Sequence, residues 1–453
     1  MKWLKISGLI IVFIMAATSA FAAYHHEGEK DAPQFLLAYP DIAGTKLDQC
    51  QLCHTGGTYK GSQMGSCQYC HAITNYGRIS GQGDNTLNQY GRDYRNYGRN
   101  AAAVFAIDAL DSDGDSYTNT VEINNMEGSE KRPTYPGNAA DYPGLIDPPQ
   151  KVYTKDMLGK LRQHTQFMLQ NANRSVDFYA EYTGVSLRVL LNDAGILQTA
   201  TGVTVYSPDG FAMSYSLYNN ESSGLYPVYD KDYKYPPSIY YYNSQADASL
   251  ETIIGWCDYS APSCIGRSNG DPIFVTAGLK AMLATKREGV DLDVGHLTAD
   301  NKLDGEGPYR IVVPQKAICA PDQSQKSSYQ NVIWPWSSSN DHNAGYSART
   351  ATIIKVEPLP QGCTDIDVYE AGWDYVDQKK IVVYGSIDPD SPVPQDPDDE
   401  TVTSSQISKS LCLIATVSSN ETGFSLTGLS ILLMIVFVPV VVSILRTKRI
   451  FNC

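Results

Sequence analysis

A five-residue pattern, Cys-x-x-Cys-His, occurs twice between residues 50 and 71. Two thiols three residues apart lie on one side of a helical turn and can bond to the two vinyl-derived carbons on one edge of a porphyrin, while the next residue can ligate the iron. This spacing is the attachment signature of c-type haem. It predicts two covalently bound haems, held by the following residues: Cys50, Cys53 and the iron ligand His54, then Cys67, Cys70 and the iron ligand His71.

Three other interpretations of the cysteines compete with haem attachment. A structural zinc site would use the thiols but gives the adjacent histidines no reason to be there. Two disulfides are compatible with an exported chain, and a thioredoxin-like pair normally sits in a βαβ context that the sequence lacks. Haem explains all six residues, and the twelve residues between His54 and Cys67 would hold two haems at close range.

Each haem iron also needs a sixth ligand. His25 and His26 are candidate distal ligands because they could fold back onto the haems, and Met64, between the two motifs, is the sulfur alternative. A second histidine would keep the reduction potential low, whereas methionine would raise it. The other histidines are expected to be ordinary polar or packed side chains: His164, His296 and His342.

Residues 111–122, DSDGDSYTNTVE, have the donor spacing of an EF-hand loop. The expected oxygen ligands of a structural Ca²⁺ are the side chains of Asp111, Asp113, Asp115, Asn119 and Glu122, with the backbone carbonyl of Tyr117. Position 6 is Ser116 instead of glycine, which makes the sharp turn less favourable. The alternative is an acidic, solvated turn.

The first 23 residues predict a secretory signal, because Lys2 and Lys5 precede a short apolar run that ends in small residues. The alternative is an N-terminal membrane helix.

The net charge of −14 argues against nucleic acid as a partner. Ten cysteines in an exported chain allow disulfides, and Cys257–Cys264 and Cys319–Cys363 are candidate pairs.

The C-terminal part predicts attachment to a membrane. Residues 389–422 form an acidic, proline-rich linker, and residues 423–453 contain an apolar run, Phe424–Leu445, that is long enough to span a bilayer as a helix. Basic residues follow the run, which places the C-terminus in the cytoplasm and the body outside it. Cys412 before such a run resembles a bacterial C-terminal sorting signal, so the tail is expected to be an anchor or a sorting tail.

The remaining sequence predicts a multidomain chain. Residues 24–148 are expected to form a small, mainly helical and irregular diheme cytochrome c domain that includes the acidic loop, and residues 149–388 a β-rich α+β domain. In the second domain, Val185–Gly195 predicts a short helix with Ser186 as its N-cap and Gly195 as its stop. The strand predictions are these: Val203–Leu217 as two strands around a Pro-Asp-Gly turn, Lys280–Leu292 as a strand into an Arg-Glu-Gly turn, Tyr309–Val313 as a buried strand, and Ala348–Leu359 as an alternating strand.

The segments TGVSLRVLLNDAG, VTVYSPDGF, MLATKREGV, GPYRIVVPQ and IIKVEPL, in this order, resemble the molybdopterin-binding fold of sulfite oxidase relatives. Over roughly Cys50 to Asp388 the chain resembles the bacterial GEGP-motif diheme c-type cytochromes, with Gly305-Glu306-Gly307-Pro308 as the named motif. The glycines and Pro308 are otherwise explained by turn chemistry. The resemblance implies a diheme electron carrier of the bacterial cell envelope.

Molybdenum is not expected in the second domain. Sulfite oxidase relatives place a metal-bound cysteine early in this domain, and no cysteine lies between Cys70 and Cys257. The prediction is extracytoplasmic electron transfer between redox partner proteins by a membrane-anchored diheme cytochrome, with the second domain setting partner choice. Two alternatives stay open: an oxidoreductase with substrate chemistry at a molybdopterin or an open haem site, and a surface scaffold stiffened by Ca²⁺.

Overall fold

The computed structural model describes residues 30–55, 57–59, 62–64, 86–172, 175–219, 224–229, 234–246, 257–298, 303–322, 341–366 and 371–393. The chain divides into two compact units, Met1–Pro397 and Asp398–Cys453, and all described residues belong to the first. The predicted signal peptide and C-terminal apolar run lie outside the described residues. Among the described residues, no helix is long and apolar enough to cross a bilayer.

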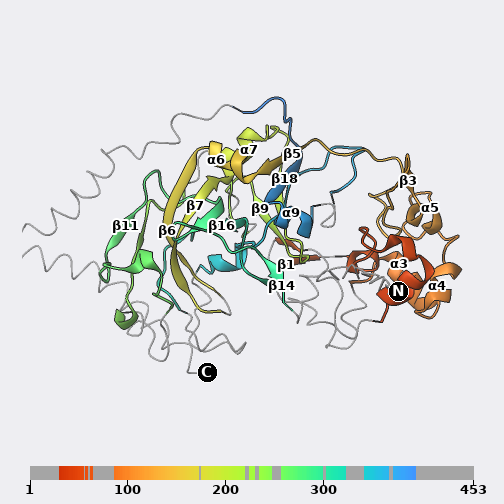
Figure 1. The fold of residues 1–453 in the computed structure, drawn as a ribbon, viewed down its shortest axis with the longest axis horizontal. Helices are drawn as coiled ribbons and strands as arrows, with labels where there is room; N and C mark the ends of the chain where they lie inside the picture. The colour runs from red at the N-terminus through yellow and green to blue at the C-terminus, as the bar shows by residue number, and fades with distance from the viewer. Residues whose placement is uncertain are drawn as a thin grey trace, which may run out of the picture. The chain divides into compact units, whose positions relative to one another are not determined.

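The described part of residues 30–147 consists of short helices joined by turns (Figure 1). Its elements are α1 (Ala32–Ala38), η1 (Pro40–Ile42), η2 (Cys50–Leu52), β1 (Gly57–Tyr59), β2 (Ser62–Met64), α3 (Gln89–Asn96), α4 (Ala101–Ala106), α5 (Asn119–Ile123), β3 (Met126–Glu127) and β4 (Glu130–Lys131). The strands form two antiparallel pairs, β1–β2 and β3–β4. These elements are too short to be stable alone, so their stability depends on packing.

Asparagine caps and a shared core explain these helices. The Asn88 side chain accepts from the Gly91 amide at the start of α3, and the Asn100 side chain accepts from the Ala103 amide at the start of α4. One apolar cluster joins all four helices and the turns between them. Its buried members are Phe35, Tyr39, Ile42, Leu47, Leu52, Tyr90, Tyr94, Ala103, Val104, Ile107, Ile123 and Tyr135. Burial of a large apolar side chain contributes about 1.5–3 kcal/mol.

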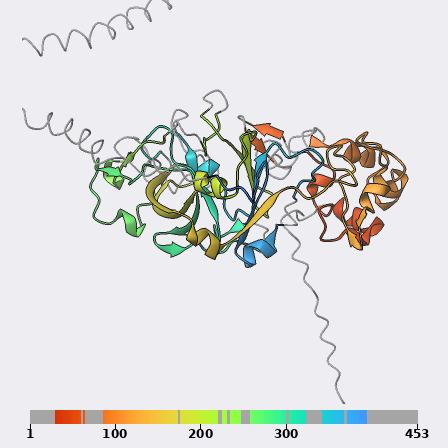
Figure 2. The same ribbon diagram turned by 90° about the horizontal axis from the view of Figure 1, so that it is seen from above.

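Residues 149–393 form a β-rich region with few helices (Figures 1 and 2). Its main elements are β5 (Gln150–Thr154), α6 (Lys155–Lys160), β6 (Gln163–Gln170), β7 (Phe178–Ser186), α7 (Leu187–Asp193), β8 (Gly202–Tyr206), β9 (Ala212–Ser216), β12 (Met282–Arg287), β13 (Val290–Asp291), β16 (Arg310–Val312), β17 (Ile353–Glu357), α9 (Trp373–Asp377) and β18 (Lys380–Gly385). Smaller elements are β10 (Ser238–Tyr240), η6 (Pro262–Cys264), β11 (Pro272–Phe274), β14 (His296–Leu297), β15 (Leu303–Asp304) and η8 (Asn343–Tyr346).

The described strands of this region build two five-stranded sheets. One has the order β13-β12-β7-β6, with β16 paired to β12, and the other has the order β5-β18-β17-β8-β9. All pairs in the two sheets are antiparallel except β17 and β18, which are parallel and are joined through α9. A single buried cluster contains side chains from both sheets and from α7, including Val185, Leu190, Leu283, Val203 and Ile354.

The structure confirms the local predictions for this region. Helix α7 begins after Ser186, whose hydroxyl accepts from the Val189 amide, and the chain leaves it at Gly195 with φ +78°. Strands β8 and β9 pair across the Pro-Asp-Gly turn, and β12 and β13 pair across Glu288 and Gly289. The two turn residues have φ +53° and +75°, the left-handed values that a tight hairpin needs.

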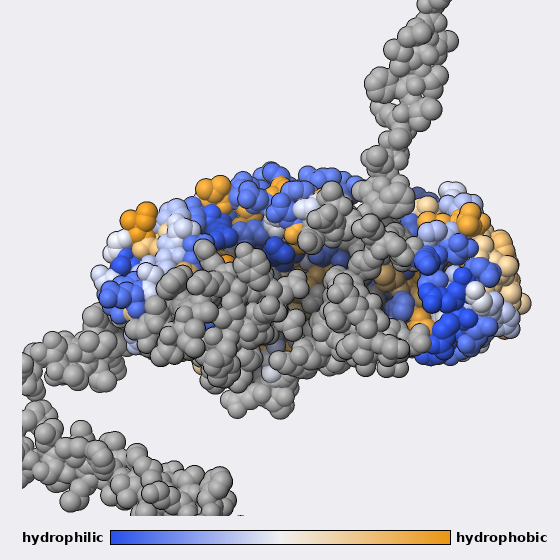
Figure 3. All heavy atoms as spheres, turned by 90° about the horizontal axis from the view of Figure 1, so that it is seen from below, coloured by the Kyte–Doolittle hydropathy of each residue, from blue (hydrophilic) through white to orange (hydrophobic). Residues whose placement is uncertain are grey.

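The described surface is mainly hydrophilic on the face shown in Figure 3, with hydrophobic side chains in separate groups. Exposed apolar side chains of the N-terminal helices include Leu37 of α1 and Phe105 of α4. Single exposed apolar side chains are normal in a folded protein. They identify no partner.

Candidate functional site: a haem-attachment turn and an acidic loop

The first Cys-x-x-Cys-His motif forms a helical turn. Gln49 is extended, η2 begins at Cys50, and the amides of Cys53 and His54 both donate to the Cys50 carbonyl, at 3.2 and 2.9 Å. This turn brings the two thiols to one side and places the histidine directly after them. This local geometry agrees with the spacing that predicts covalent attachment of one haem.

The His54 side chain is oriented by a residue far away in the sequence. Its Nδ1 lies 2.8 Å from the hydroxyl oxygen of Thr86, and the Thr55 amide donates to the Thr86 carbonyl at 2.8 Å. His54 also forms an antiparallel bridge with Leu87. If Nδ1 donates to the hydroxyl, the lone pair of the imidazole is on Nε2, the tautomer that coordinates iron through Nε2.

Helix α3 packs directly on the motif. The Asn88 amide donates to the Cys53 carbonyl at 2.9 Å, and the Asn88 side-chain amide donates to the Leu52 carbonyl at 2.9 Å. A Cβ on Gly91 would clash with the Cys53 carbonyl oxygen and would lie 3.0 Å from the Cys53 Cβ. Sequence reasoning missed Thr86, Asn88 and Gly91, although a glycine inside a helix is a signal of close backbone approach.

The residues around this motif fit a covalently bound haem. Tyr90 of α3 is 1% exposed, and its hydroxyl has no hydrogen-bond partner among the described residues. Tyr90 is a member of the buried apolar cluster against which Cys53 packs. Burial raises the pKa of Tyr90 well above its usual value. A buried hydroxyl without a partner is costly, and a polar group of a bound cofactor would supply one.

The second predicted attachment motif is not among the described residues. Cys67, Cys70 and His71, and the candidate distal ligands His25 and His26, lie outside the described residues. Met64 ends β2, where its backbone pairs with Gly57 of β1. These residues stay predictions.

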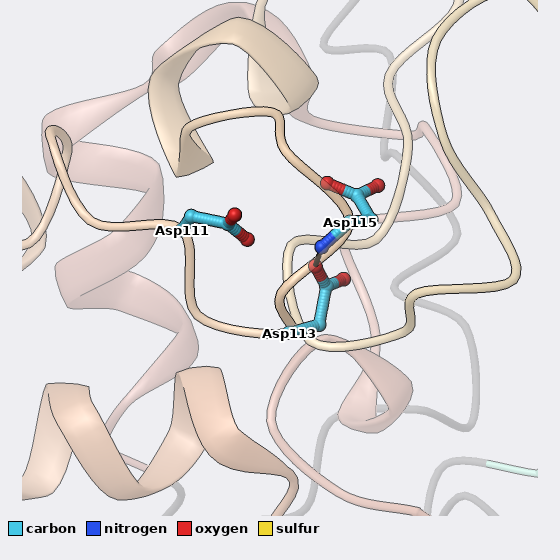
Figure 4. A group of neighbouring side chains, drawn as sticks. All are labelled: Asp111, Asp113 and Asp115. Carbon is cyan, nitrogen blue, oxygen red and sulfur yellow. Dashed lines mark hydrogen bonds between the residues drawn. The ribbon is translucent and has the colours of Figure 1, made fainter.

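The acidic loop brings its first three carboxylates together (Figure 4). One side-chain oxygen from each of Asp111, Asp113 and Asp115 lies within 4.8 Å of the others. Each side chain is also held by backbone amides: Asp111 accepts from Gly114 at 2.7 Å and from Ser116 at 3.0 Å, Asp113 accepts from Asp115 at 3.3 Å, and Asp115 accepts from Tyr117 at 2.8 Å. The loop is therefore shaped by its own carboxylates.

The other carboxylate oxygens have no partner. Oδ2 of Asp113, Oδ2 of Asp115 and Oε2 of Glu122 are buried and form no hydrogen bond with any residue that the structure describes. Glu122 is fully buried, and its Oε1 accepts from the Thr134 hydroxyl at 3.2 Å. Buried, uncompensated carboxylate oxygens are expensive unless a cation neutralises them. Hard oxygen donors in this arrangement fit Ca²⁺.

The pKa values of the carboxyl groups report the same imbalance. Burial, together with the charges of Asp113 and Asp115, raises the pKa of Glu122 to about 9. Burial and the charge of Asp115 raise the pKa of Asp113 to about 6. Without a cation, Glu122 would retain its proton at neutral pH, whereas Asp113 would be mostly ionised and would gain a proton only in mildly acidic solution. A bound divalent cation would favour the ionised forms of both groups.

Two details of the loop depart from the expected pattern. Ser116 adopts φ +85°, so the turn that glycine usually makes at position 6 is made by serine at some cost. Asn119 begins α5, and its side chain bonds within the loop: Oδ1 accepts from the Ser112 amide at 3.2 Å, and the amide donates to the Ile107 carbonyl at 2.8 Å. Asn119 thus has a structural role in this geometry. Tyr117 stacks on Tyr142 with ring centroids 6.4 Å apart.

The GEGP segment forms a charged junction in the β-rich region. Glu306 forms ion pairs with Arg310 and with Arg287, the latter at 3.4 Å. Arg310 is 6% exposed, and its guanidinium also donates to the Tyr182 hydroxyl at 3.2 Å. Gly305 has φ +83°, and a Cβ there would lie 2.7 Å from the Val294 carbonyl oxygen. The motif therefore combines close backbone packing with a buried ion pair, as turn chemistry predicts for its glycines.

The two candidate disulfides are not formed in the structure. Cys264, Cys319 and Cys363 have free thiols. Cys319 instead accepts a hydrogen bond from the side-chain amide of Gln315 at 2.8 Å, and burial raises its pKa to about 11. The predictions of a Cys257–Cys264 and a Cys319–Cys363 disulfide are therefore wrong. Cys264 and Cys363 are instead packed as separate buried thiols.

Comparison with known proteins adds no relative, because no family model, curated protein or solved structure matches the chain.

Proposed function

We propose that the protein is a diheme c-type cytochrome that transfers electrons outside the bacterial cytoplasm, anchored to the membrane by its C-terminal segment. Haem would supply reversible one-electron chemistry at iron. The resemblance to GEGP-motif diheme cytochromes and the duplicated attachment motif support this proposal. The observation that carries it is the Cys50–His54 turn, with His54 Nδ1 at hydrogen-bond distance from Thr86.

The chain's own residues would have distinct roles in this proposal. Cys50 and Cys53 anchor the first haem, His54 ligates its iron, and Thr86 fixes the orientation and tautomer of the imidazole. Asn88 and Gly91 allow α3 to lie against the attachment turn. Cys67, Cys70 and His71 would repeat the first three roles for the second haem.

The β-rich region, in this proposal, is a fold similar to that of sulfite oxidase relatives that works without molybdopterin and sets the choice of redox partner. Its support is the order of sequence segments and the absence of an early cysteine in the sequence. The buried Glu306–Arg310 pair is most simply explained as part of its packing.

The test is to express the exported, full-length chain with haem-maturation machinery and to measure its intact mass and its pyridine haemochrome spectrum. The expected result is two haem masses per chain, one fewer in the Cys50→Ser/Cys53→Ser variant, and iron without molybdenum. A colourless protein with the mass of the bare polypeptide would exclude the proposal. Molybdenum, or a high-spin ferric haem that binds small ligands, would favour the oxidoreductase alternative.

A further inference from the structure

The acidic loop is connected to the segment that follows it in the chain. The Thr134 amide donates to the Glu122 carbonyl at 3.0 Å, and the Thr134 hydroxyl donates to Glu122 Oε1 at 3.2 Å. Thr134 is 5% exposed. Any movement of Glu122 toward a cation in the loop therefore acts on Thr134 and on its neighbour, Tyr135.

Tyr135 is in turn connected to the haem-attachment turn. Its hydroxyl donates to the Lys46 carbonyl at 2.9 Å, lies 3.2 Å from Gln51 Oε1, and accepts from the Gln49 side-chain amide. Gln49 directly precedes Cys50, and Gln51 lies between the two attachment cysteines. The ring of Tyr135 is part of the same buried cluster as Leu47 and Leu52.

From this chain of contacts we propose that cation binding by the Asp111–Glu122 loop positions the first haem-attachment turn, and that the Tyr135 hydroxyl transmits the effect. The proposal rests on the proposed function for its haem, but the link between the loop and residues 46–52 is a property of the polypeptide itself. A cation would draw the unpartnered oxygens of Asp113, Asp115 and Glu122 together. Thr134 and Tyr135 would then be held, and with them the turn that begins at Cys50.

Thermodynamic linkage makes this coupling reciprocal. If Ca²⁺ stabilises the ordered attachment turn, a haem fixed to that turn must raise the affinity of the loop for Ca²⁺ by the same factor. The same loop has a second contact, since the Ser112 hydroxyl donates to Asp93 of α3 at 2.9 Å. The amides of α3 therefore report closure of the loop independently of Tyr135.

The experiment is amide hydrogen exchange of the full chain, purified with and without haem maturation, in Ca²⁺ and after removal of Ca²⁺ with a chelator. Calcium affinity is measured on the same samples by calorimetry, and haem content by the pyridine haemochrome. We expect Ca²⁺ to slow exchange at residues 46–52 by about tenfold, in haem-free and haem-loaded protein alike. A haem-free outcome after maturation would exclude the proposed function without affecting this measurement.

The deciding variant is Tyr135→Phe, which keeps the ring in the core and removes the hydroxyl. We expect it to bind Ca²⁺ and to keep the slowed exchange in α3, but to lose the slowing at residues 46–52. Tyr142→Phe is the matched control, because Tyr142 stacks on Tyr117 of the loop through its ring. The inference is overturned if the loop binds no Ca²⁺, if exchange at residues 46–52 does not respond to it, or if Tyr135→Phe responds like the unmodified protein.

Discussion

His54 Nδ1 lies 2.8 Å from the hydroxyl oxygen of Thr86, a residue 32 positions further along the chain. Thr86 is 5% exposed, so water does not readily replace its hydroxyl. This contact ties a predicted iron ligand to the strand-like segment that leads into α3. In the proposed function, Thr86 is a positioning residue for the first haem.

The first prediction concerns this contact. In Thr86→Val the imidazole loses its hydrogen-bond acceptor, donates less charge to iron, and stabilises the ferric state less. The midpoint potential of the first haem should rise by about 40 mV, which corresponds to a hydrogen bond of about 1 kcal/mol for one electron. Potentiometric titration with optical detection measures it. Thr86→Ser keeps the hydroxyl and should restore the original potential, and an unchanged potential in Thr86→Val would exclude this role.

The second prediction concerns the close approach of α3 to the attachment turn. In Gly91→Ala the new methyl group meets the Cys53 carbonyl oxygen, so the helix must move away. The free energy of unfolding should fall by about 1–3 kcal/mol, and less haem should be attached at the first motif. Gly159→Ala in α6 is the control, because a Cβ there meets nothing within 4 Å, and alanine should stabilise that helix by about 0.5–1 kcal/mol. Denaturant unfolding and haem content per chain distinguish the two outcomes.

The third prediction is the pH dependence of the calcium-free protein. The pKa of Glu122 is raised from 4.5 to about 9, so between these values the folded protein retains a proton that the unfolded chain has released. Stability in a chelator should therefore be highest below the lower value and should fall as the pH rises toward 9, by at most about 1.4 kcal/mol per pH unit for this carboxyl group. Ca²⁺ should remove this slope because it favours the ionised form.

Thermal unfolding across pH, with and without Ca²⁺, measures this effect. Glu122→Gln should flatten the slope in the chelator and weaken Ca²⁺ binding. Glu130→Gln, at an exposed position of β4, should do neither. A slope that is the same in Glu122→Gln and in the unmodified protein would show that another group causes it.

The fourth prediction concerns the GEGP motif. Glu306→Gln leaves the buried Arg310 without its carboxylate, and the loss of one partner of a buried ion pair costs about 3–5 kcal/mol. Glu357→Gln is the control, because Glu357 is one-third exposed and its partner Lys355 also pairs with Asp365 at 2.9 Å. It should cost less than about 1 kcal/mol. Equal denaturation midpoints for the two variants would contradict a packing role for Glu306.

The turn at Cys50–His54 and the carboxylate cluster of the acidic loop could be predicted from the sequence because both depend on spacing within a few residues; haem attachment itself stays a prediction. The Cys50–His54 turn and the Asp111–Asp115 cluster both have the local geometry that their spacing implies. The strand and turn signals around Gly195, Gly210 and Gly289 were reliable for the same reason, since a left-handed residue is required at one position. The fold-family resemblance and the second haem stay predictions.

The partners of these residues could not be predicted, because they come from distant parts of the chain. Nothing in the residues near His54 indicates Thr86, and nothing near Glu122 indicates that Thr134 would bond to it. Arg310 is four residues from Glu306, but Arg287 comes from another strand. For Asn119 the spacing predicted a calcium ligand that the structure does not show. Asn119 lies at the start of α5, and its side-chain oxygen accepts from the Ser112 amide instead.

Asp141 is a buried carboxylate on which three separated segments meet. It forms a salt bridge with Lys46 at 2.7 Å, accepts from the Tyr135 amide at 2.9 Å, and accepts from the Thr364 hydroxyl at 3.1 Å. The chain can therefore not be truncated near residue 148 without breaking contacts of Asp141. A recombinant fragment ending there would lose the Thr364 contact, and joining residues 30–147 to another protein would require a replacement donor for Asp141.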